Sequence, residues 1–181
     1  MKKYALIAPM IVPMIFSAAP AFAEKPYVGV DYFIASYDQI NADLNSQGVR
    51  IKTGSEITPY FAIEVFIAST VENTLNRTNG QEIDASLESI VGASVRLQYP
   101  VVQDRVGLYT TLGVSRAVIV AKSELLLDEE ISAAESGTSL GFGVDVAVSK
   151  QWLVNLDYTS YVNRGAVELN AASIGIKYRL D

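Results

Sequence analysis

The chain has 181 residues, half of them hydrophobic, with 20 acidic against 14 basic residues and a net charge of −6. An acidic chain repels polyanions, which argues against nucleic acid as a partner. It contains no cysteine and no histidine, which removes disulfides, thiolate metal sites and the usual general base of hydrolases. We therefore expect no enzymatic activity, no cofactor and no metal site.

Residues 1–23 have the pattern of a cleaved secretory signal peptide. Lys2 and Lys3 precede an apolar stretch over residues 4–16, and Ala21-Phe22-Ala23 has the small-x-small form of a signal-peptidase site. The alternative is an uncleaved membrane helix, but Pro9, Pro13 and Pro20 interrupt residues 1–23. Cleavage would leave residues 24–181 as one domain, with 12 basic residues against 20 acidic ones.

After residue 24, hydrophobic residues recur at every second position, which is typical of strands with one apolar face. Segment 58–69 shows this well, since Phe61 and Ile63 alternate with Ala62 and Glu64. Seven further segments follow the same pattern. In chain order the apolar faces carry Val28, Val30, Tyr32, Ile34; Val49, Ile51; Phe61, Ile63, Val65, Ile67; Leu87, Val91, Val95, Leu97; Val106, Leu108, Leu112, Val114; Leu140, Phe142, Val144, Val146, Val148; Trp152, Val154, Leu156, Tyr158; and Ile174, Ile176, Tyr178, Leu180.

The expected connections between these strands alternate in length. Longer ones at 37–47, 71–85, 121–136 and 163–168 alternate with shorter ones at 55–57, 100–104 and 149–151. Such sorting is expected of extracellular loops and periplasmic turns, whereas a soluble sandwich has no reason for it. The sequence therefore predicts an all-β fold, an eight-stranded antiparallel up-and-down transmembrane β-barrel.

In such a barrel the face opposite the apolar one lines the lumen. An eight-stranded barrel is just wide enough to be filled by side chains, so charged groups from opposite walls can meet, and an unpaired buried charge is costly. We predict a paired network that closes the lumen, with Glu64 beside Arg50; a selective conducting pore is the alternative. The predicted network contains Asp31, Arg50, Lys52, Glu64, Glu88, Arg96, Asp145, Asp157, Lys177 and Arg179, with small inward residues Gly107, Gly113, Gly141, Gly143 and Gly175 making room for them.

Tyr99, Trp152 and Tyr178 lie on apolar faces near the short connections, where an interfacial girdle of aromatic residues is expected. Arg116 departs from the pattern, because strict alternation from Val106 points it toward lipid. Its side chain could extend to lipopolysaccharide phosphates, or a β-bulge could turn it inward.

Segment 122–136 is the longest expected loop. It places three leucines beside three acidic residues, at Leu125, Leu126, Leu127, Asp128, Glu129 and Glu130. One reading is a strand extension with a solvated acidic tip. The other is an exposed contact patch for a surface partner.

The opening Tyr27-Val28-Gly29-Val30-Asp31-Tyr32 and the closing segment 172–180 resemble the OmpA/OmpX-like family of outer-membrane barrel domains. The resemblance implies an outer-membrane location in contact with lipid and lipopolysaccharide. It also implies that the barrel-assembly machinery reads the closing residues Ile174, Ile176, Tyr178 and Leu180. Family roles include envelope integrity, adhesion and small-solute passage.

The sequence thus favours a structural, envelope-integrity or adhesive barrel with a plugged lumen. A narrow porin-like channel for small solutes is the first alternative. The second is a soluble periplasmic β-barrel binder, which would need a roomy apolar interior where this chain has charged residues.

Overall fold

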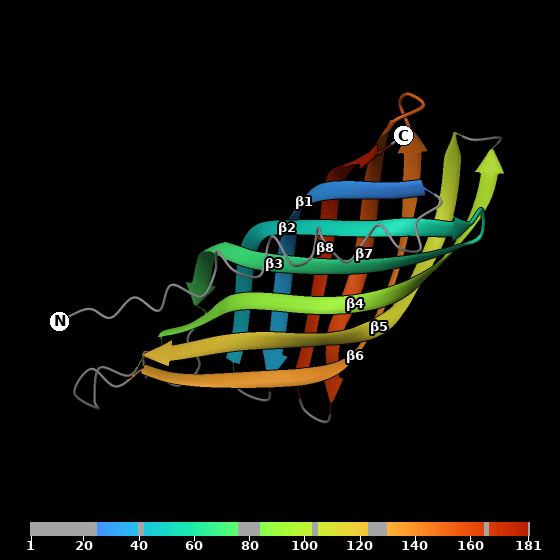
Figure 1. Ribbon diagram of the computed structural model, residues 1–181. Coiled ribbons are helices and arrows are strands. Elements are labelled where there is room, and N and C mark those ends of the chain that lie inside the picture. Colours follow the sequence, from blue (N-terminus) through green and yellow to red (C-terminus); the bar gives the residue numbers. More distant parts are fainter. Residues whose placement is uncertain are drawn as a thin grey trace.

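The computed structural model describes residues 25–39, 42–75, 84–102, 105–122, 130–164 and 167–180. Each strand pairs antiparallel with the next and the last pairs with the first, so the predicted eight-stranded closed barrel is confirmed (Figure 1). The predicted signal peptide lies outside the described residues, and none of those described forms a helix long and apolar enough to cross a membrane. The strands are β1 (Lys25–Gln39), β2 (Ala42–Thr58), β3 (Phe61–Leu75), β4 (Asp84–Val102), β5 (Val106–Lys122), β6 (Glu130–Ala147), β7 (Trp152–Arg164) and β8 (Val167–Arg179).

The alternation of side chains places an apolar belt on the outside of the barrel. Val30 and Ile34 of β1 expose about half of their surface, while Asp31 between them is buried. Thr53 and Thr110 lie in this belt, and each satisfies its hydroxyl on the backbone, since an unbonded hydroxyl is costly in hydrocarbon. Thr53 Oγ1 donates to the Tyr27 carbonyl at 3.0 Å, and Thr110 Oγ1 donates to the Gly141 carbonyl at 2.8 Å.

Several predicted connections are wrong because the strands run further than their apolar parts. The turn predicted at 55–57 lies inside β2, and the chain reverses at Pro59-Tyr60 instead. Proline has no N–H to donate to a ladder, so it suits the turn. The pairs Gln39↔Ala42 and Arg164↔Val167 show that most of 37–47 and 163–168 is strand. Backbone pairing continues through these polar segments because it does not depend on an apolar face.

A β-bulge in β4 corrects two further predictions. The register between β4 and β5 shifts between Leu87 and Ser89. A bulge inserts one extra residue and inverts the alternation on one side of it. As a result Leu87, predicted on the apolar outer face, is buried, and Glu88, predicted in the lumen, is exposed.

Glycines face the inward aromatic rings across neighbouring strands. Tyr27 is paired with Gly54, and Tyr109 with Gly143. A Cβ on Gly54 would lie 2.6 Å from the Tyr27 ring, and one on Gly143 would lie 2.5 Å from the Tyr109 ring. These glycines leave the space that the rings occupy. Gly107 has no such role, because its Cβ would meet only a backbone oxygen at 3.8 Å.

Candidate functional site in the barrel lumen

Arg50 of β2 lies at the centre of a buried cluster. Its Nε donates to Asp31 at 2.6 Å, and its Nη2 donates to Asp157 at 2.7 Å and to Ser173 at 2.9 Å. The remaining Nη1 donates to the Tyr161 hydroxyl at 2.7 Å. One guanidinium therefore joins β1, β2, β7 and β8 through charge-assisted hydrogen bonds, which are the stronger kind.

Lys52 and Asn155 complete this cluster. Lys52 Nζ lies 2.9 Å from an Asp31 oxygen and 3.8 Å from an Asp157 oxygen. Asn155 Nδ2 donates to the other Asp31 oxygen at 2.9 Å. Two cations and two carboxylates thus share one site in which charge balances, as burial of charged groups requires.

A second cluster lies nearer the short turns, on β4, β6 and β8. Asp145 pairs with Arg96 and also accepts from Lys177 Nζ at 2.7 Å. The Arg96 guanidinium lies over the Tyr109 ring, 3.5 Å from its centroid, in a cation–π contact. Tyr109 in turn donates its hydroxyl to Asp157 at 3.0 Å, which links the two clusters.

Glu64 belongs to the second cluster and not to the first. It accepts a hydrogen bond from the Tyr27 hydroxyl at 2.9 Å and lies 4.0 Å from Arg96 Nη1. The predicted contact of Glu64 with Arg50 is wrong, since Arg50 is paired in register with Ala68. A turn at 55–57 would place Glu64 and Arg50 at similar heights, but the chain reverses at Pro59-Tyr60, which puts Glu64 nearer the turn and Arg50 further from it.

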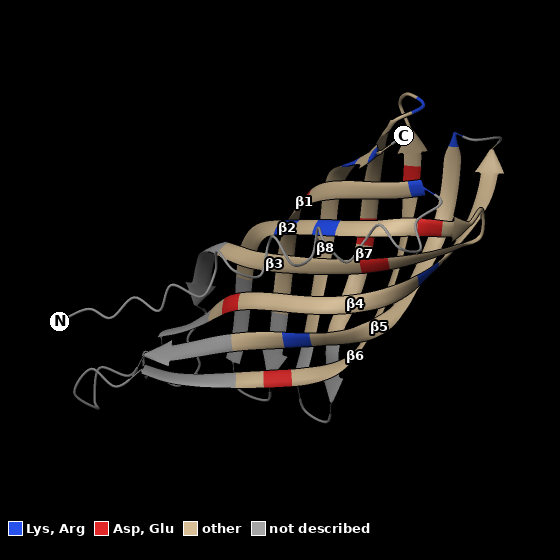
Figure 2. Ribbon diagram, in the orientation of Figure 1, with Lys and Arg blue, Asp and Glu red and all other residues tan. Residues whose placement is uncertain are grey.

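The two other predicted lumen residues lie elsewhere. Arg179 is partly exposed at the short-turn end, where its Nη2 lies 3.2 Å from Glu56 Oε1. Glu56 escaped the sequence analysis because it had been assigned to a turn. Glu88 lies on the outer face at the bulge of β4 and takes no part in the lumen. Charged positions are spread singly over several strands, as Figure 2 shows.

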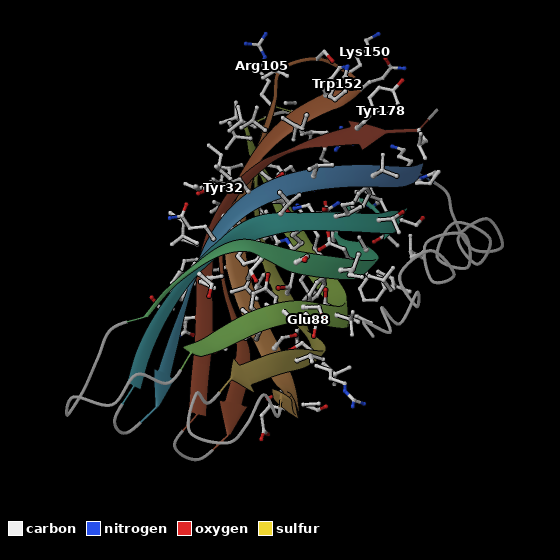
Figure 3. All side chains as sticks on the ribbon, turned by 90° about the vertical axis from the view of Figure 1, so that its left-hand side faces the viewer. Tyr32, Glu88, Arg105, Lys150, Trp152 and Tyr178 are labelled. Carbon is white, nitrogen blue, oxygen red and sulfur yellow. The ribbon has the colours of Figure 1, made fainter. Side chains whose placement is uncertain are left out.

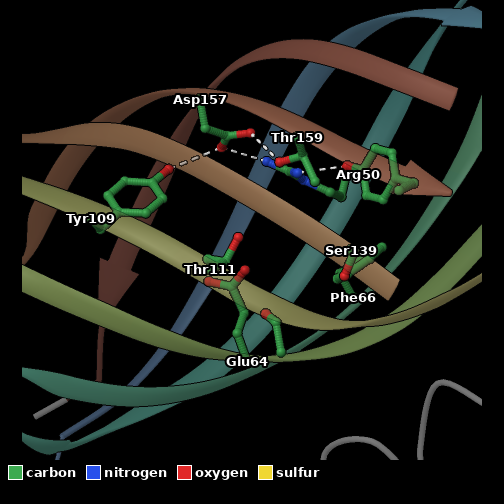
Figure 4. A pocket seen from close by; sticks show the side chains of 10 residues that line it. Arg50, Glu64, Phe66, Tyr109, Thr111, Ser139, Asp157 and Thr159 are labelled. Atoms are coloured by element: carbon green, nitrogen blue, oxygen red, sulfur yellow. Dashed lines mark hydrogen bonds and ion pairs between the residues drawn. The ribbon is translucent and has the colours of Figure 1, made fainter. Parts of the chain in front are cut away.

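A cavity of about 20 Å³ lies between the clusters, with room for about one water molecule. Arg50, Glu64, Tyr109 and Asp157 line it, together with small hydroxyl side chains of β4 to β7 (Figure 4). The hydrogen bonds of Asp157 to Arg50 and Tyr109 border it. The hydroxyl residues are Ser94, Thr111, Ser139 and Thr159.

An apolar layer fills the lumen on the side away from the short turns. It follows the charged residues along each strand: Phe33 and Ala35 come after Asp31 in β1, and Tyr161 comes after Asp157 in β7. Sequence reasoning missed this layer, although the same alternation that placed Asp31 in the lumen places Phe33 there. Its members are Phe33, Ala35, Phe66, Ala68, Leu87, Ile90, Ala117, Tyr161, Leu169 and Ala171.

The predicted girdle residues lie on the outside at the short-turn end. Trp152 and Tyr178 are cross-strand partners with ring centroids 4.8 Å apart, and Tyr99 is exposed on β4. Figure 3 shows Trp152 and Tyr178 at the same end as Arg105 and Lys150 of the turns. Of the closing residues proposed as an assembly signal, Ile174, Ile176 and Leu180 are exposed on the outer face beside Tyr178.

The last predicted site is the contact patch in segment 122–136. Leu125, Leu126, Leu127, Asp128 and Glu129 lie outside the described residues. Glu130 begins β6, opposite Lys122 in the register. Over the described part of the chain, no group of three or more acidic residues could hold a metal ion.

An apolar outer belt, an aromatic girdle and a packed, charged lumen together define a small outer-membrane β-barrel protein. Residues 10–179 match the model of the outer membrane protein beta-barrel domain family, so the chain belongs to that family. The protein is accordingly one of the bacterial outer membrane. A comparison with curated protein sequences finds no match.

Solved barrels share the fold at low sequence identity. The neisserial surface protein NspA is 16% identical with a TM-score of 0.68, covering 86% of this chain and 97% of its own. Ail of Yersinia pestis, solved in complex with the heparin analogue sucrose octasulfate, is 16% identical with a TM-score of 0.64, covering 86% and 98%. The N-terminal barrel domain of Pseudomonas aeruginosa OprF is 10% identical with a TM-score of 0.57, covering 85% and 97%.

Proposed function

We propose that this protein is a non-conducting outer-membrane barrel, without enzymatic activity, that acts in envelope integrity or adhesion through its extracellular surface. The observation that carries the proposal is that side chains fill the lumen at two levels. Two charge-paired clusters lie nearer the short turns, and an apolar layer lies beyond them. An ion crossing the lumen would have to break buried pairs and then pass a layer that is mostly apolar.

The distribution of charge supports a role for the extracellular end. The lumen clusters balance, with Arg50, Lys52, Arg96 and Lys177 against four carboxylates. By contrast, the strand ends and connections opposite the short turns, at 36–47, 69–90, 115–139 and 160–170, hold 12 acidic and 4 basic residues. With the long connections outside, the exposed surface would be strongly acidic. An adhesive partner would then be cationic, or joined through bound cations.

Conductance in planar bilayers tests the sealed lumen. The wild-type barrel is expected to give little or no steady current. A large, steady current would instead support the first alternative, a narrow porin-like channel. The second alternative, a soluble periplasmic binder, does not fit a membrane protein whose outer face is an apolar belt.

Retention on charged resins tests the surface role. The barrel in nanodiscs is expected to bind a polylysine resin and to pass through a heparin resin. It should be released from the polylysine resin when added salt screens the attraction. Empty nanodiscs of the same lipid are the control. Binding to heparin instead of polylysine would contradict a cationic partner.

A further inference from the structure

Arg116 lies on the outside of β5, beyond the last strongly exposed apolar residue of that strand, and the next outward residue, Val118, is less exposed. Two outward residues that precede it, Leu112 and Val114, are among the most exposed residues of the belt, and Arg116 continues their face. The bulge considered for this residue lies instead on the neighbouring strand β4. Its position is therefore the edge of the hydrocarbon layer, where a long basic side chain can run along apolar surface and hold its charge at headgroup level.

Hydroxyl side chains lie next to Arg116 on β6. Ser136 is its direct partner in the register, and Thr138 is the partner of Val114 on the same outer face. Both are exposed. Directly opposed residues have Cβ atoms about 5 Å apart, so a group bound by the guanidinium would be within reach of at least one hydroxyl.

No anion of the protein neutralises Arg116 in the described ranges. Glu88 is exposed on the neighbouring strand β4, diagonally across the register, yet forms no ion pair with it. Glu135 adjoins Ser136 but is paired with the buried Ala117, which places it on the lumen face. The charged residues of β4, β5 and β6 can be followed in Figure 2.

We propose that Arg116, with Ser136 and Thr138, binds a phosphate group of lipid A in the outer leaflet. A guanidinium presents paired N–H donors that match phosphate oxygens, and the hydroxyls can donate to the oxygens left over. The choice of leaflet rests on the proposed function, which places the long connections outside the cell. The binding chemistry itself does not depend on that orientation.

Lipid titration of the purified barrel, followed by native mass spectrometry, tests the site. Diphosphorylated lipid A is compared with dephosphorylated lipid A and with phosphatidylglycerol. The wild type is expected to prefer diphosphorylated lipid A over the other two. Arg116→Gln should weaken its binding about tenfold, as the loss of one charge-assisted bond predicts, and should abolish the preference.

Glu88→Gln is the matched control, since Glu88 is also an exposed charge, on the adjoining strand. It is expected to leave binding unchanged or slightly tighter. Arg116→Lys keeps the charge but loses the paired N–H donors of the guanidinium, so its affinity for lipid A should fall between those of the wild type and Arg116→Gln. The proposal is overturned if Arg116→Gln binds like the wild type, if Glu88→Gln weakens binding as much, or if phosphatidylglycerol binds as tightly as lipid A. All variants should first show the heat-dependent gel shift of a folded barrel.

Orientation is measured separately, which the absence of cysteine makes simple. Asn79→Cys, in the connection between β3 and β4, should react with an impermeant maleimide on intact cells. Lys150→Cys, in the β6–β7 turn, should not. The reverse labelling would overturn the proposed outward surface and the outer-leaflet assignment, while the lipid titration would still decide whether Arg116 binds phosphate.

Discussion

Among single residues, Arg50 has the most demanding environment, because its guanidinium is buried and bonded to two carboxylates and two hydroxyls. Replacing one partner of a buried ion pair leaves the other charge without compensation. Removing Arg50 and Asp157 together restores the balance, since Lys52 still pairs with Asp31 at 2.9 Å. Replacing Arg50 alone should therefore destabilise the barrel more than replacing Arg50 and Asp157 together.

We predict that Arg50→Gln destabilises the barrel by roughly 3–5 kcal/mol. The double variant Arg50→Gln/Asp157→Asn should cost less than the sum of its parts, with a coupling of about 0.5–3 kcal/mol. Urea unfolding in lipid vesicles measures both quantities. Arg50 and Glu56 serve as the control pair, since Glu56 pairs with Arg179 at the short-turn end, away from Arg50, and their effects should add. Strong coupling there would contradict the register.

At the scale of the strands, the two faces should respond very differently to the same kind of change. Ile63 is exposed in the belt of β3, whereas its neighbour Ala62 is fully buried in the lumen. Ile63→Arg should cost roughly 1–4 kcal/mol, since the cost of a charged residue on the lipid face rises from the interface toward the bilayer midplane. Ala62→Ser should be mild, and equal costs in vesicle refolding would show that the faces are misassigned.

Strand pairing also makes two inward glycines of the β5–β6 hairpin unequal. Gly143→Ala would press a Cβ against the Tyr109 ring, so we expect a loss of about 1–3 kcal/mol, typical of overpacking. Gly107→Ala meets only a backbone oxygen at 3.8 Å and should be nearly neutral. The same urea titrations rank the two variants, and a neutral Gly143→Ala would argue against the close ring contact.

Sequence reasoning reached most of the fold because alternation is a local property. The apolar faces around Val30, Ile63 and Leu156 could be read directly, and so could the inward position of Asp31. The bulge that turned Glu88 outward left no signal, because it depends on pairing with β5. The pairing of lumen residues could not be predicted either. The contact of Arg50 with Asp157 depends on barrel closure and on the stagger of the strands, and alternation encodes neither.

For the whole molecule, the decisive event is the meeting of β1 with β8, which pair from Tyr27↔Arg179 to Gln39↔Val167. The Arg50 cluster straddles this seam. Arg50 on β2 reaches Asp157 and Tyr161 on β7 and Ser173 on β8. The bonds of Arg96 do not cross the seam, because its partners Glu64 and Asp145 lie on β3 and β6.

These two arginines should therefore affect different steps of folding. Contacts across the seam form only when the barrel closes, so Arg50→Gln should speed unfolding by about a hundredfold or more, as its cost in stability requires, and leave the folding rate nearly unchanged. Contacts within β3 to β6 can form earlier, so Arg96→Gln should also slow folding. Gel-shift kinetics of insertion and of urea-induced unfolding in vesicles measure both rates. If Arg50→Gln slowed folding while unfolding stayed at the wild-type rate, its cluster would form before the strands close, and the seam would be held by backbone pairing alone.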